Sequence, residues 1–316
     1  MKLHNIDCDF SPGIINATIN RKDTNNLFDE VNNLKKKYQY TKIQKLSSSE
    51  LSTIIDTDLY DGGCLDFGAG HLNPLKFVQG LGTAAKKNNV QIFEKCCVEK
   101  IDYGKKNIIS VSNGYTVISD YLIIACNGYL GNLEPNISSR VMPINNFILT
   151  TEVLGNNLLN SFLNNNYAVA DNKFVPNYFR PSPDNRLIFG GGENYTYRFP
   201  KDIKGIVRKK MLKVYPQLKN TRIDFAWGGT LAVTRNRLPY FAKIQPNVFS
   251  ASGYSGHGVA LSVLAGKIIA ELIEGDSKRF NFMNNIPIKP FPGNSNFQWP
   301  LLVLGMLWYS LRDRFK

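Results

Sequence analysis

Residues 250–259 read SASGYSGHGV, and this stretch lies between an apolar segment typical of a strand and a long segment with helical spacing. Its glycines allow the backbone to approach a ligand closely, and the start of the following helix offers free N–H groups and a positive dipole. The pattern suits an anion or the electron-rich edge of a cofactor ring, with His257 at the mouth of the turn. A tight strand-to-helix turn without a ligand is an equally good interpretation of these residues alone.

Two further stretches place small or polar residues where a predicted element ends. YLIIAC, residues 121–126, has the pattern of a strand buried on both faces and leads into Asn127-Gly128. That exit would let a ligand lie against the backbone at the carboxyl end of a parallel sheet. GAGHLNP, residues 68–74, holds His71 just before a predicted helix that begins at Pro74. A core strand with a tight exit and a loop histidine with a local hydrogen bond are the alternative interpretations.

The predicted secondary structure changes twice along the chain, from α/β to mostly β and back to α/β. This order is expected for a β domain inserted into an α/β domain. Helices are predicted over 24–37, 74–87, 201–215 and 259–273, with a further helix start at 47–51. Strands are predicted over 90–93, 121–126, 147–153, 174–180, 186–189, 223–233 and 247–252. A loop punctuated by glycine is predicted over 62–70, and a meander with a hairpin turn at 113–114 over 96–118.

The composition is that of an ordinary globular protein and excludes several other classes. The 316 residues are 43% hydrophobic and 20% charged, with a net charge of +13, which favours polyanions without choosing among them. Aromatic residues are not interleaved with lysine and arginine as a stacking platform requires, so we expect no nucleic-acid partner. The hydrolase, nucleotide-phosphate and zinc-protease motifs GxSxG, GxxxxGK[ST] and HExxH are absent from the sequence.

Cysteine and histidine are few and scattered. The five cysteines form no CxxC pair and there are only three histidines, so we expect no disulfide framework, no metal site, and the reduced thiols of a cytoplasmic protein. The longest apolar stretch, 301–309, is far shorter than the ~20 residues that span a bilayer. Aromatic and basic residues around it would suit a lipid interface, but a helix docked on the protein body is the preferred interpretation, so membrane contact is not expected.

Taken together, these stretches resemble the FAD-dependent amine and amino-acid oxidoreductases of the D-amino-acid oxidase superfamily, and within it the γ-glutamylputrescine oxidase-like branch. The resemblance covers most of residues 40–316 in order and is specific as a set rather than piece by piece. The stretches that carry it are GGCLDFGAGHLNP (62–74), LIIACNGYLGNLEP (122–135), RVMPINNF (140–147), NYFRPSPDNRLIFGGGENY (177–195), FAWGGTLAVTRNRLPYF (225–241), SGYSGHGVALSVLAGK (252–267) and the tail 291–314.

The resemblance implies an α/β fold, with an FAD-binding Rossmann-like domain, incomplete at its N-terminal side, and an inserted, mostly antiparallel β substrate domain. The expected division is an N-terminal helical segment (1–58), two parts of the FAD-binding domain (59–140 and 239–282), the substrate domain (141–238) and a C-terminal tail with a short apolar helix (283–316).

The resemblance also implies a reaction and a set of site residues. A hydride would leave a carbon that bears a neutral amine, giving an imine that hydrolyses, and oxygen or another acceptor would take the electrons. The substrate would be a small amine or amino acid. The residues implied for catalysis are His71, Tyr178 and His257, and those for the substrate are Tyr178, Arg180 and Trp227. The residues implied for FAD are Val98, Cys126, Asn127, Gly128, Ser252, Gly253, Tyr254, Ser255, Gly256, His257, Gly258 and Val259.

Three departures from the family pattern refine these expectations. Some relatives carry a lysine for a substrate carboxylate two positions after the glycine-histidine-glycine turn, where this chain has Ala260, which favours an amine whose reacting end lacks a carboxylate. No cysteine lies in 227–240, where some relatives attach flavin, so FAD should be noncovalent. No GxGxxG turn precedes residue 60. The chain is therefore expected to be an oxidoreductase or, alternatively, an inactive C-terminal fragment or a partner of a separately encoded N-terminal FAD-binding piece.

Overall fold

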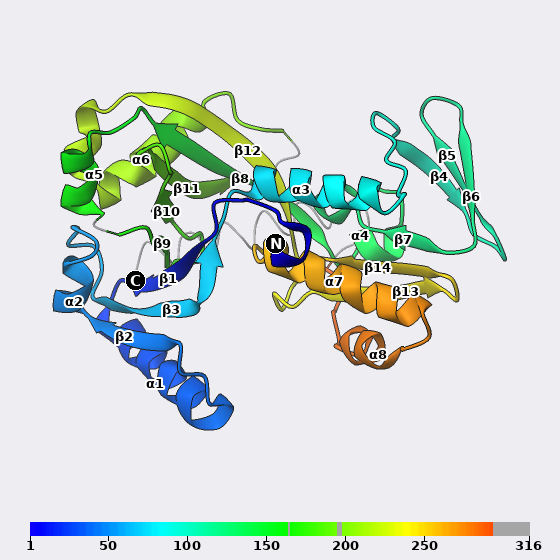
Figure 1. Ribbon diagram of the computed structural model, residues 1–316, viewed down its shortest axis with the longest axis horizontal. Coiled ribbons are helices and arrows are strands. Elements are labelled where there is room, and N and C mark those ends of the chain that lie inside the picture. The colour runs from blue at the N-terminus through cyan, green and yellow to red at the C-terminus, as the bar shows by residue number, and fades with distance from the viewer. Residues whose placement is uncertain (164, 195–197, 293–316) are drawn as a thin grey trace.

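The computed structural model describes residues 1–163, 165–194 and 198–292. In these residues the strands form one eight-stranded sheet and two three-stranded sheets. The large sheet lies on one side of the molecule, and both small sheets lie on the other side (Figure 1). The α/β class is confirmed. None of the helices in the described part of the chain is both long enough and apolar enough to cross a bilayer. The tail over 293–316, on which the membrane-interface interpretation rests, lies outside the described residues.

The eight-stranded sheet is mostly antiparallel, as predicted for the substrate domain. Its order is β12 (Ile223–Val233), β8 (Met142–Thr151), β11 (Leu187–Asn194), β10 (Tyr178–Pro181), β9 (Ala168–Asp171), β1 (Ser11–Thr18), β3 (Gly62–His71) and β2 (Ile43–Ser47). Only β1 and β9 pair in parallel. The predicted strand over 223–233 matches β12, whereas the strand predicted over 174–180 is confined to the short β10.

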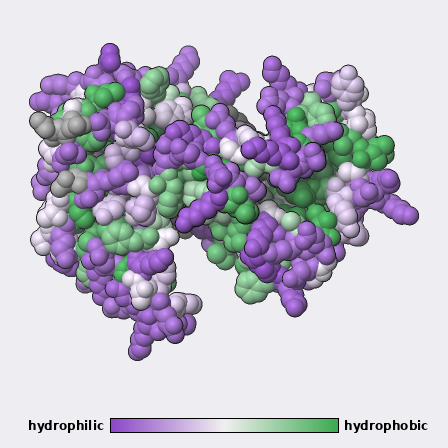
Figure 2. All heavy atoms as spheres, viewed as in Figure 1, coloured by the Kyte–Doolittle hydropathy of each residue, from purple (hydrophilic) through white to green (hydrophobic). Residues whose placement is uncertain are grey.

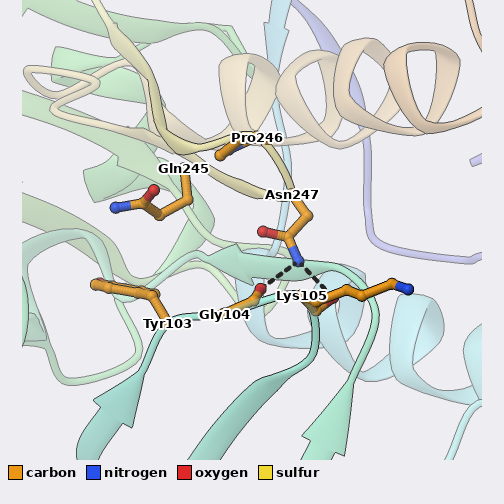
Figure 3. A pocket seen from close by; sticks show the side chains of 6 residues that line it. All are labelled: Tyr103, Gly104, Lys105, Gln245, Pro246 and Asn247. Atoms are coloured by element: carbon orange, nitrogen blue, oxygen red, sulfur yellow. Dashed lines mark hydrogen bonds between the residues drawn. The ribbon is translucent and has the colours of Figure 1, made fainter.

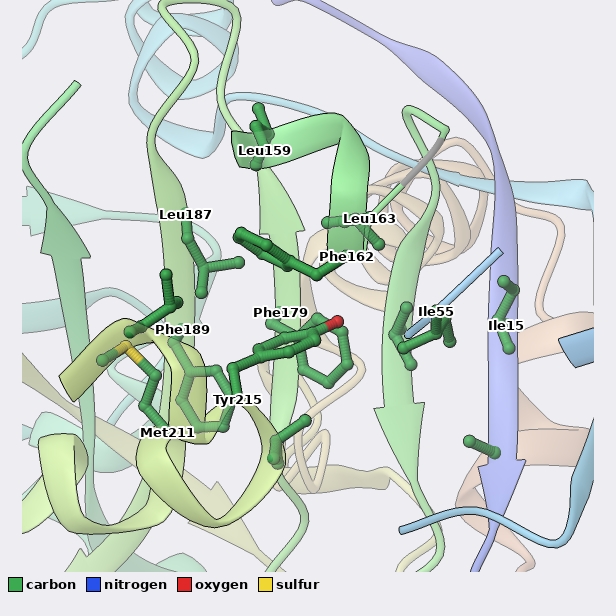
Figure 4. Close-up of a cluster of buried hydrophobic side chains, with 14 of the residues drawn as sticks. Ile15, Ile55, Leu159, Phe162, Leu163, Phe179, Leu187, Phe189, Met211 and Tyr215 are labelled. Atoms are coloured by element: carbon green, nitrogen blue, oxygen red, sulfur yellow. The ribbon is translucent and has the colours of Figure 1, made fainter. Parts of the chain in front are cut away.

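One face of this sheet is closed by a hydrophobic core (Figure 4). Alternate residues of the strands point into it, and Phe179 on β10 stacks on Phe189 on β11 with ring centroids 5.5 Å apart. The Tyr215 ring packs against Phe179 with centroids 5.3 Å apart and against Phe162 with centroids 4.6 Å apart. The helices on this side are α2 (Ser48–Ser52), α5 (Asn156–Phe162), α6 (Ile203–Val214) and the 3-10 helix η3 (Pro216–Asn220).

The first 58 residues contain more than the predicted helical segment. The helix α1 (Arg21–Tyr38) agrees with the prediction and begins at Asn20, whose side chain accepts a hydrogen bond from the Asp23 N–H. Ser47 and Glu50 form the expected capping box at α2. However, β1 and β2 were not predicted, and both pair with β3. The loop predicted over 62–70 is wrong, because these glycines lie inside β3, where they allow close approach of neighbouring backbone and side chains.

The opposite side of the molecule contains the smaller sheets. One has the order β13 (Tyr240–Gln245), β14 (Val248–Ser252) and β7 (Leu122–Ile124), with β14 and β7 parallel. Phe280 on α8 (Lys278–Asn284) packs with Phe241 and Phe249 of this sheet, and α7 (Gly258–Ile273) shares the same core. Two short elements flank the sheet, η2 (Asn127–Tyr129) and α4 (Pro135–Ser138).

The other small sheet is the predicted meander of β4 (Val98–Asp102), β5 (Asn107–Val111) and β6 (Thr116–Ser119), with Gly114 at positive φ in the hairpin turn. Helix α3 (Pro74–Lys87) has the expected bounds and the Asn73 cap, but none of its side chains is buried. Near the N-terminus, the short η1 (Lys2–His4) lies against α3.

Two predictions for this side of the molecule are wrong. The segment 90–93 forms no strand, although its VQIF sequence favours one. Strand β7 is not buried on both faces, because Ile123 is 45% exposed. In both places a strand-type sequence lacks the neighbouring strand that would bury it.

Candidate functional site

The turn between β14 and α7 is held in one conformation by glycine and by a contact with η2. Gly253 has a φ of +70°, and a Cβ there would lie 2.6 Å from the Thr234 Cγ2. Its N–H donates to the Asn127 Oδ1 at 3.0 Å. The parallel pairing of β7 and β14 brings Asn127 and Gly253 together, because both residues follow the carboxyl end of a strand. The two stretches singled out in the sequence therefore meet in space.

Hydrogen bonds connect this turn to the large sheet. The Ser255 N–H donates to the Ala232 carbonyl of β12 at 2.9 Å, and the Thr230 N–H donates to the Tyr129 hydroxyl at 3.2 Å. Thr230 Oγ1 in turn donates to the Asn145 Oδ1 of β8 at 3.0 Å. The candidate cofactor turn and the neighbouring η2, which contains Tyr129, are thus fixed against β12 and β8 of the large sheet.

The turn is open on its outer side. His257 and Gly256 are exposed, Val259 is 50% exposed, and a Cβ at Gly256 would meet nothing within 4 Å. At the end of β14 the Ser252 hydroxyl is buried and has no hydrogen-bond partner in the described chain. A buried orphan hydroxyl beside free N–H groups of a helix start can receive a polar, electron-rich ring edge. These residues therefore fit the ring end of a flavin.

The same residues do not provide a place for the phosphates of a dinucleotide. In the described part of the chain, no second glycine-rich turn opens a helix beside β7 or β14. The residues present consequently fit one end of FAD and not the whole molecule.

The face of the large sheet opposite its core carries the predicted substrate residues. Phe179 points into the core, so Tyr178 and Arg180, its neighbours along β10, point to the other face. The ladder pairs Tyr178 with Gly190, Gly190 with Ile148, and Ile148 with Trp227. Since neighbouring strands are ~4.8 Å apart, Tyr178 and Trp227 stand ~14 Å apart in one row across four strands. The structure therefore brings both residues to one face.

Gly190 decides where the Tyr178 ring lies. An added Cβ at Gly190 would lie 2.0 Å from the Tyr178 Cε2, so the ring occupies the space above the glycine. From there the Tyr178 hydroxyl donates to the Asn146 Oδ1 of β8. Burial raises the pKa of Tyr178, with the charge of Glu193 adding to the shift, so the phenol stays protonated.

Sequence reasoning did not single out Asn146, Gly190 or Thr230. A usable signal was present, because Asn145-Asn146 interrupts the apolar strand sequence MPINNFIL, and buried amides in a strand require hydrogen-bond partners. The position of Gly190 against a tyrosine ring could not be read from the sequence, since it depends on strand register.

Arg180 and His71 lie close to each other at the end of β3. Arg180 Nη2 donates to the Leu72 carbonyl at 3.3 Å, and His71 Nε2 lies 2.8 Å from the Asn166 carbonyl oxygen. Burial lowers the pKa of His71, and the nearby Arg180 charge lowers it further, so the imidazole is neutral near pH 7. Its Nδ1 is buried without a partner in the described chain, which leaves one ring nitrogen available.

The other predicted site residues are spread over the opposite side. Cys126 follows β7, where burial raises the pKa of its thiol and the nearby Cys97 raises it further. Cys97 precedes Val98, which begins β4, so this strand lies near the exit of β7. Tyr254 is buried and donates to the Ala251 carbonyl, a structural role inside the turn. In the described residues, no hydrogen bond or ion pair joins His257 to Tyr178 or to His71.

A pocket of about 440 Å³ lies on the outer side of the small sheets (Figure 3). Asn247 Nδ2 donates to the carbonyls of Gly104 and Lys105 in its wall, which ties β14 to the turn between β4 and β5. None of the predicted site residues lines this pocket, which is lined by Tyr103, Gly104, Lys105, Gln245, Pro246 and Asn247.

Comparisons with known proteins agree with this geometry. Residues 1–272 match the family described as DAO, FAD dependent oxidoreductase. The chain is 36% identical over 315 residues to gamma-glutamylputrescine oxidoreductase from Escherichia coli, covering 99% of this chain and 74% of that protein. It is also 36% identical over 312 residues to the probable oxidoreductase OrdL from Rhizobium meliloti, covering 99% of this chain and 72% of that protein.

Solved structures share the fold at lower identity. Glycine oxidase from Geobacillus kaustophilus superposes with a TM-score of 0.75 at 19% identity, over 90% of this chain and 77% of that chain. L-proline dehydrogenase from P. horikoshii superposes with a TM-score of 0.73 at 18% identity, over 88% of this chain and 76% of that chain. The similarity covers both sides of the molecule.

Proposed function

Because the chain belongs to the FAD-dependent oxidoreductase (DAO) family, we propose that it forms the site of an enzyme that oxidises the C–N bond of a small amine. The observation that carries this proposal is the meeting of Asn127 and Gly253 at the end of the parallel strands, within hydrogen-bonded reach of β12 and β8. A γ-glutamylputrescine-like amine is the proposed substrate, and an amino acid is the second choice.

FAD is the family's cofactor, and we propose that the open turn holds its ring end without a covalent bond. The N–H groups of Gly256, Gly258 and Val259 would face the ring edge that gains negative charge on reduction, whereas the His257 N–H already donates to the Tyr254 carbonyl at 3.0 Å. Preorganised N–H groups stabilise such charge without reorganising. The Ser252 hydroxyl would supply a further donor. The bound FAD would supply the acceptor for a hydride from the carbon next to the amine nitrogen, with oxygen or another acceptor taking the electrons.

The row from Tyr178 to Trp227 is the proposed substrate surface. Its floor is made by Gly190 and Ile148, and aromatic side chains stand at both ends. An apolar floor between aromatic walls favours the neutral form of an amine by desolvation, and only that form can lose a hydride. The Tyr178 hydroxyl, held by Asn146, would orient the substrate's polar groups.

Arg180 and His71 are proposed to receive the far end of the substrate. Burial lowers the pKa of Arg180, and this partly desolvated cation would pair with a carboxylate such as that of a γ-glutamyl group. The exposed Ala260 leaves no cation near the start of α7 at that position, which agrees with a reacting end that lacks a carboxylate. The neutral His71 would serve as a hydrogen-bonding group beside Arg180 rather than as a second charge.

A second proposal concerns how a complete FAD site is formed. The phosphate cradle that FAD needs is missing from the described residues, so we propose that residues 1–316 act together with a separately supplied FAD-binding piece. The alternative is an inactive fragment. The five free cysteines favour a reducing compartment, and we propose the cytoplasm.

Flavin titration followed by an amine-oxidation assay tests the function. FAD should acquire a shifted absorbance spectrum on binding to the protein, and γ-glutamylputrescine should then give peroxide or reduce an artificial electron acceptor. Tyr178→Phe and Gly190→Ala should each lower kcat/KM for the amine about tenfold or more while FAD binding stays unchanged, since they act on the substrate surface. The function is refuted if FAD binds, with or without an added FAD-binding piece, and no amine is oxidised.

A further inference from the structure

Three segments of the chain meet where β3 ends and α3 begins. The Asn73 N–H donates to the Cys8 carbonyl at 2.8 Å, which holds the segment before β1 against the start of α3. Arg180 on β10 reaches the same place, because its Nη2 donates to the Leu72 carbonyl at 3.3 Å. The visible surface around α3 is largely hydrophilic (Figure 2). This junction therefore gathers polar groups from the N-terminal segment, from α3 and from the large sheet.

Arg180 is a cation that no carboxylate of the described chain neutralises in an ion pair. Its side-chain hydrogen bonds within residues 1–163, 165–194 and 198–292 go to the backbone carbonyls of Pro181 and Leu72, at 3.2 and 3.3 Å. The side chain is half-buried, and burial lowers the pKa of Arg180. A guanidinium in such a place binds a carboxylate with defined geometry. The junction therefore offers a cation for one carboxylate of a ligand.

Asp9 supplies an anion at the same junction. Its Oδ1 accepts a hydrogen bond from Lys76 Nζ at 2.8 Å, whereas its Oδ2 has no hydrogen-bond partner in the part of the chain that the structure describes. Lys76 lowers the pKa of the Asp9 carboxyl, and the charge of the nearby Arg180 lowers it further, so Asp9 is ionised near pH 7. One carboxylate oxygen is thus free to accept from a ligand.

Lys76 holds this carboxylate in place. Lys76 lies in the first turn of α3, where the positive end of the helix dipole disfavours a cation. The ion pair with Asp9 offsets this cost and ties Asp9, which has an uncommon φ of +52°, to the helix. Lys76 therefore acts on the position of Asp9 rather than on the helix.

His71 adds an acceptor beside Arg180. Its Nε2 lies 2.8 Å from the Asn166 carbonyl oxygen, and because a carbonyl only accepts, Nε2 must carry the proton. The neutral ring then has a bare lone pair on Nδ1, which is buried and has no partner in the described residues. A buried acceptor of this kind is costly unless a donor reaches it. A ligand with an N–H donor would satisfy it.

From these groups we propose that Arg180, Asp9 and His71 form a subsite for the zwitterionic head of an α-amino acid, such as the head of a γ-glutamyl group. We name these three residues the head subsite. Arg180 would bind the carboxylate, and the Asp9 Oδ2 and the His71 Nδ1 would accept from the ammonium group, with Lys76 as a positioning residue. The proposal rests on the proposed function and concerns the end of the substrate that does not react.

The position of the head subsite agrees with this assignment. Tyr178 lies two residues from Arg180 on the same face of β10, about 6.7 Å along the strand, so the head subsite continues the proposed substrate surface. A ligand that carried only a carboxylate would leave the acceptors of Asp9 and His71 unused. The observed set of one cation and two acceptors therefore favours an amino-acid head over a simple carboxylate.

Binding of small amides to the flavin-free chain, measured by calorimetry, tests the head subsite. γ-Glutamylethylamide carries both head groups, glutaric acid monoethylamide lacks the amino group, and 4-aminobutanoyl ethylamide lacks the carboxylate. The first should bind with a Kd about tenfold lower than either of the others, because each lost head group removes hydrogen bonds to a charged partner. Arg180→Gln should weaken binding of both carboxylate-bearing amides about tenfold.

Asp9→Asn separates recognition of the amino group from folding. It should raise the Kd for γ-glutamylethylamide about tenfold and leave the Kd for glutaric acid monoethylamide unchanged, since only the ammonium contacts Asp9. The unchanged second Kd also shows that the variant is folded. Asp102→Asn is the matched control, because Asp102 pairs with Lys100 at 2.7 Å on β4, in one of the small sheets. It should bind all three amides like the unaltered chain.

The outcomes separate the head subsite from the proposed function. The head subsite is overturned if γ-glutamylethylamide does not bind, if it binds no better than glutaric acid monoethylamide, or if Asp102→Asn weakens binding as much as Asp9→Asn. Equal binding of the two carboxylate-bearing amides would mean a simple carboxylate site. Affinities in the expected order support the head subsite even if the flavin-loaded protein oxidises no amine, in which case only the proposed function fails.

Discussion

The helices α6 and α7 show how differently the two sides of the molecule are completed. α6 carries lysine and arginine over much of its outer side, and its apolar residues Val207, Met211 and Val214 are all buried on the large sheet. α7 is far more apolar in sequence, with Lys267 and Glu271 as its charged residues, yet Val259 and Val263 remain half exposed. A helix buries apolar residues only where a packing surface is present, and the small-sheet side offers α7 only one such surface.

The strands repeat this contrast. The sequence over 223–233 predicts β12, and its neighbour β8 pairs with it from Ile223 to Val233 with one register shift, between Ile223 and Phe225. The sequence over 90–93 predicts a strand equally well, but no described strand lies beside it. The difference lies in the neighbours and not in the local sequence. A change in the core of the large sheet should therefore cost much more stability than a matched change at an exposed apolar residue on the small-sheet side.

The largest effect is expected in the core of the large sheet. Phe189 is fully buried and stacks on Phe179, so Phe189→Ala removes a ring and leaves a cavity. We expect a loss of about 3–5 kcal/mol in the free energy of unfolding, measured by urea denaturation. Phe93→Ala, at a residue that is 71% exposed, serves as the matched control and should change it by less than about 0.5 kcal/mol. Similar losses for both variants would contradict the contrast.

A smaller effect is expected where β14 joins β7. The Ser250 hydroxyl is buried and donates to the Ile124 carbonyl at 2.7 Å. Ser250→Ala should lower the free energy of unfolding by about 1 kcal/mol, the net contribution of a typical buried hydrogen bond. Ser161→Ala removes the same type of bond, to the Leu158 carbonyl at 2.8 Å, from an exposed position and should have little effect. A Ser250→Ala loss no larger than that of Ser161→Ala would mean that β7 adds nothing to the sheet's stability.

The same contrast explains what the sequence could predict. Apolar spacing and start signals located α1, α3, α6 and α7, because these signals are local, as the Asn73-Pro74 start of α3 shows. The strands β1 and β2 were missed because their sequences are polar on one face and gain strand character only by pairing with β3. Glycines normally interrupt strands, so the glycine-rich β3 was read as a loop.

The candidate site was predictable only in part for a similar reason. The stretches around Asn127 and Gly253 were identifiable because small residues at the end of an apolar run are a local pattern. That these two stretches share a hydrogen bond follows from the parallel register of β7 and β14. The space that Gly190 leaves for the Tyr178 ring depends on the register of β10 and β11, which turn geometry and burial set together. Positions in adjacent strands therefore could not be assigned from the sequence.

The smallest expected effect is that of Val263→Ala, and comparing it with Val207→Ala gives the sharpest test, because one residue type is changed on two helices. Val207 on α6 is fully buried, whereas Val263 on α7 is 46% exposed. Val207→Ala should cost about 2 kcal/mol of unfolding free energy through lost burial and a cavity. Val263→Ala should change it by less than about 0.5 kcal/mol, since its side chain already contacts water.

Urea denaturation of the two variants checks this comparison. Equal losses would contradict it, because they would show that Val263 is packed as closely as Val207, although Val263 is 46% exposed and Val207 is fully buried.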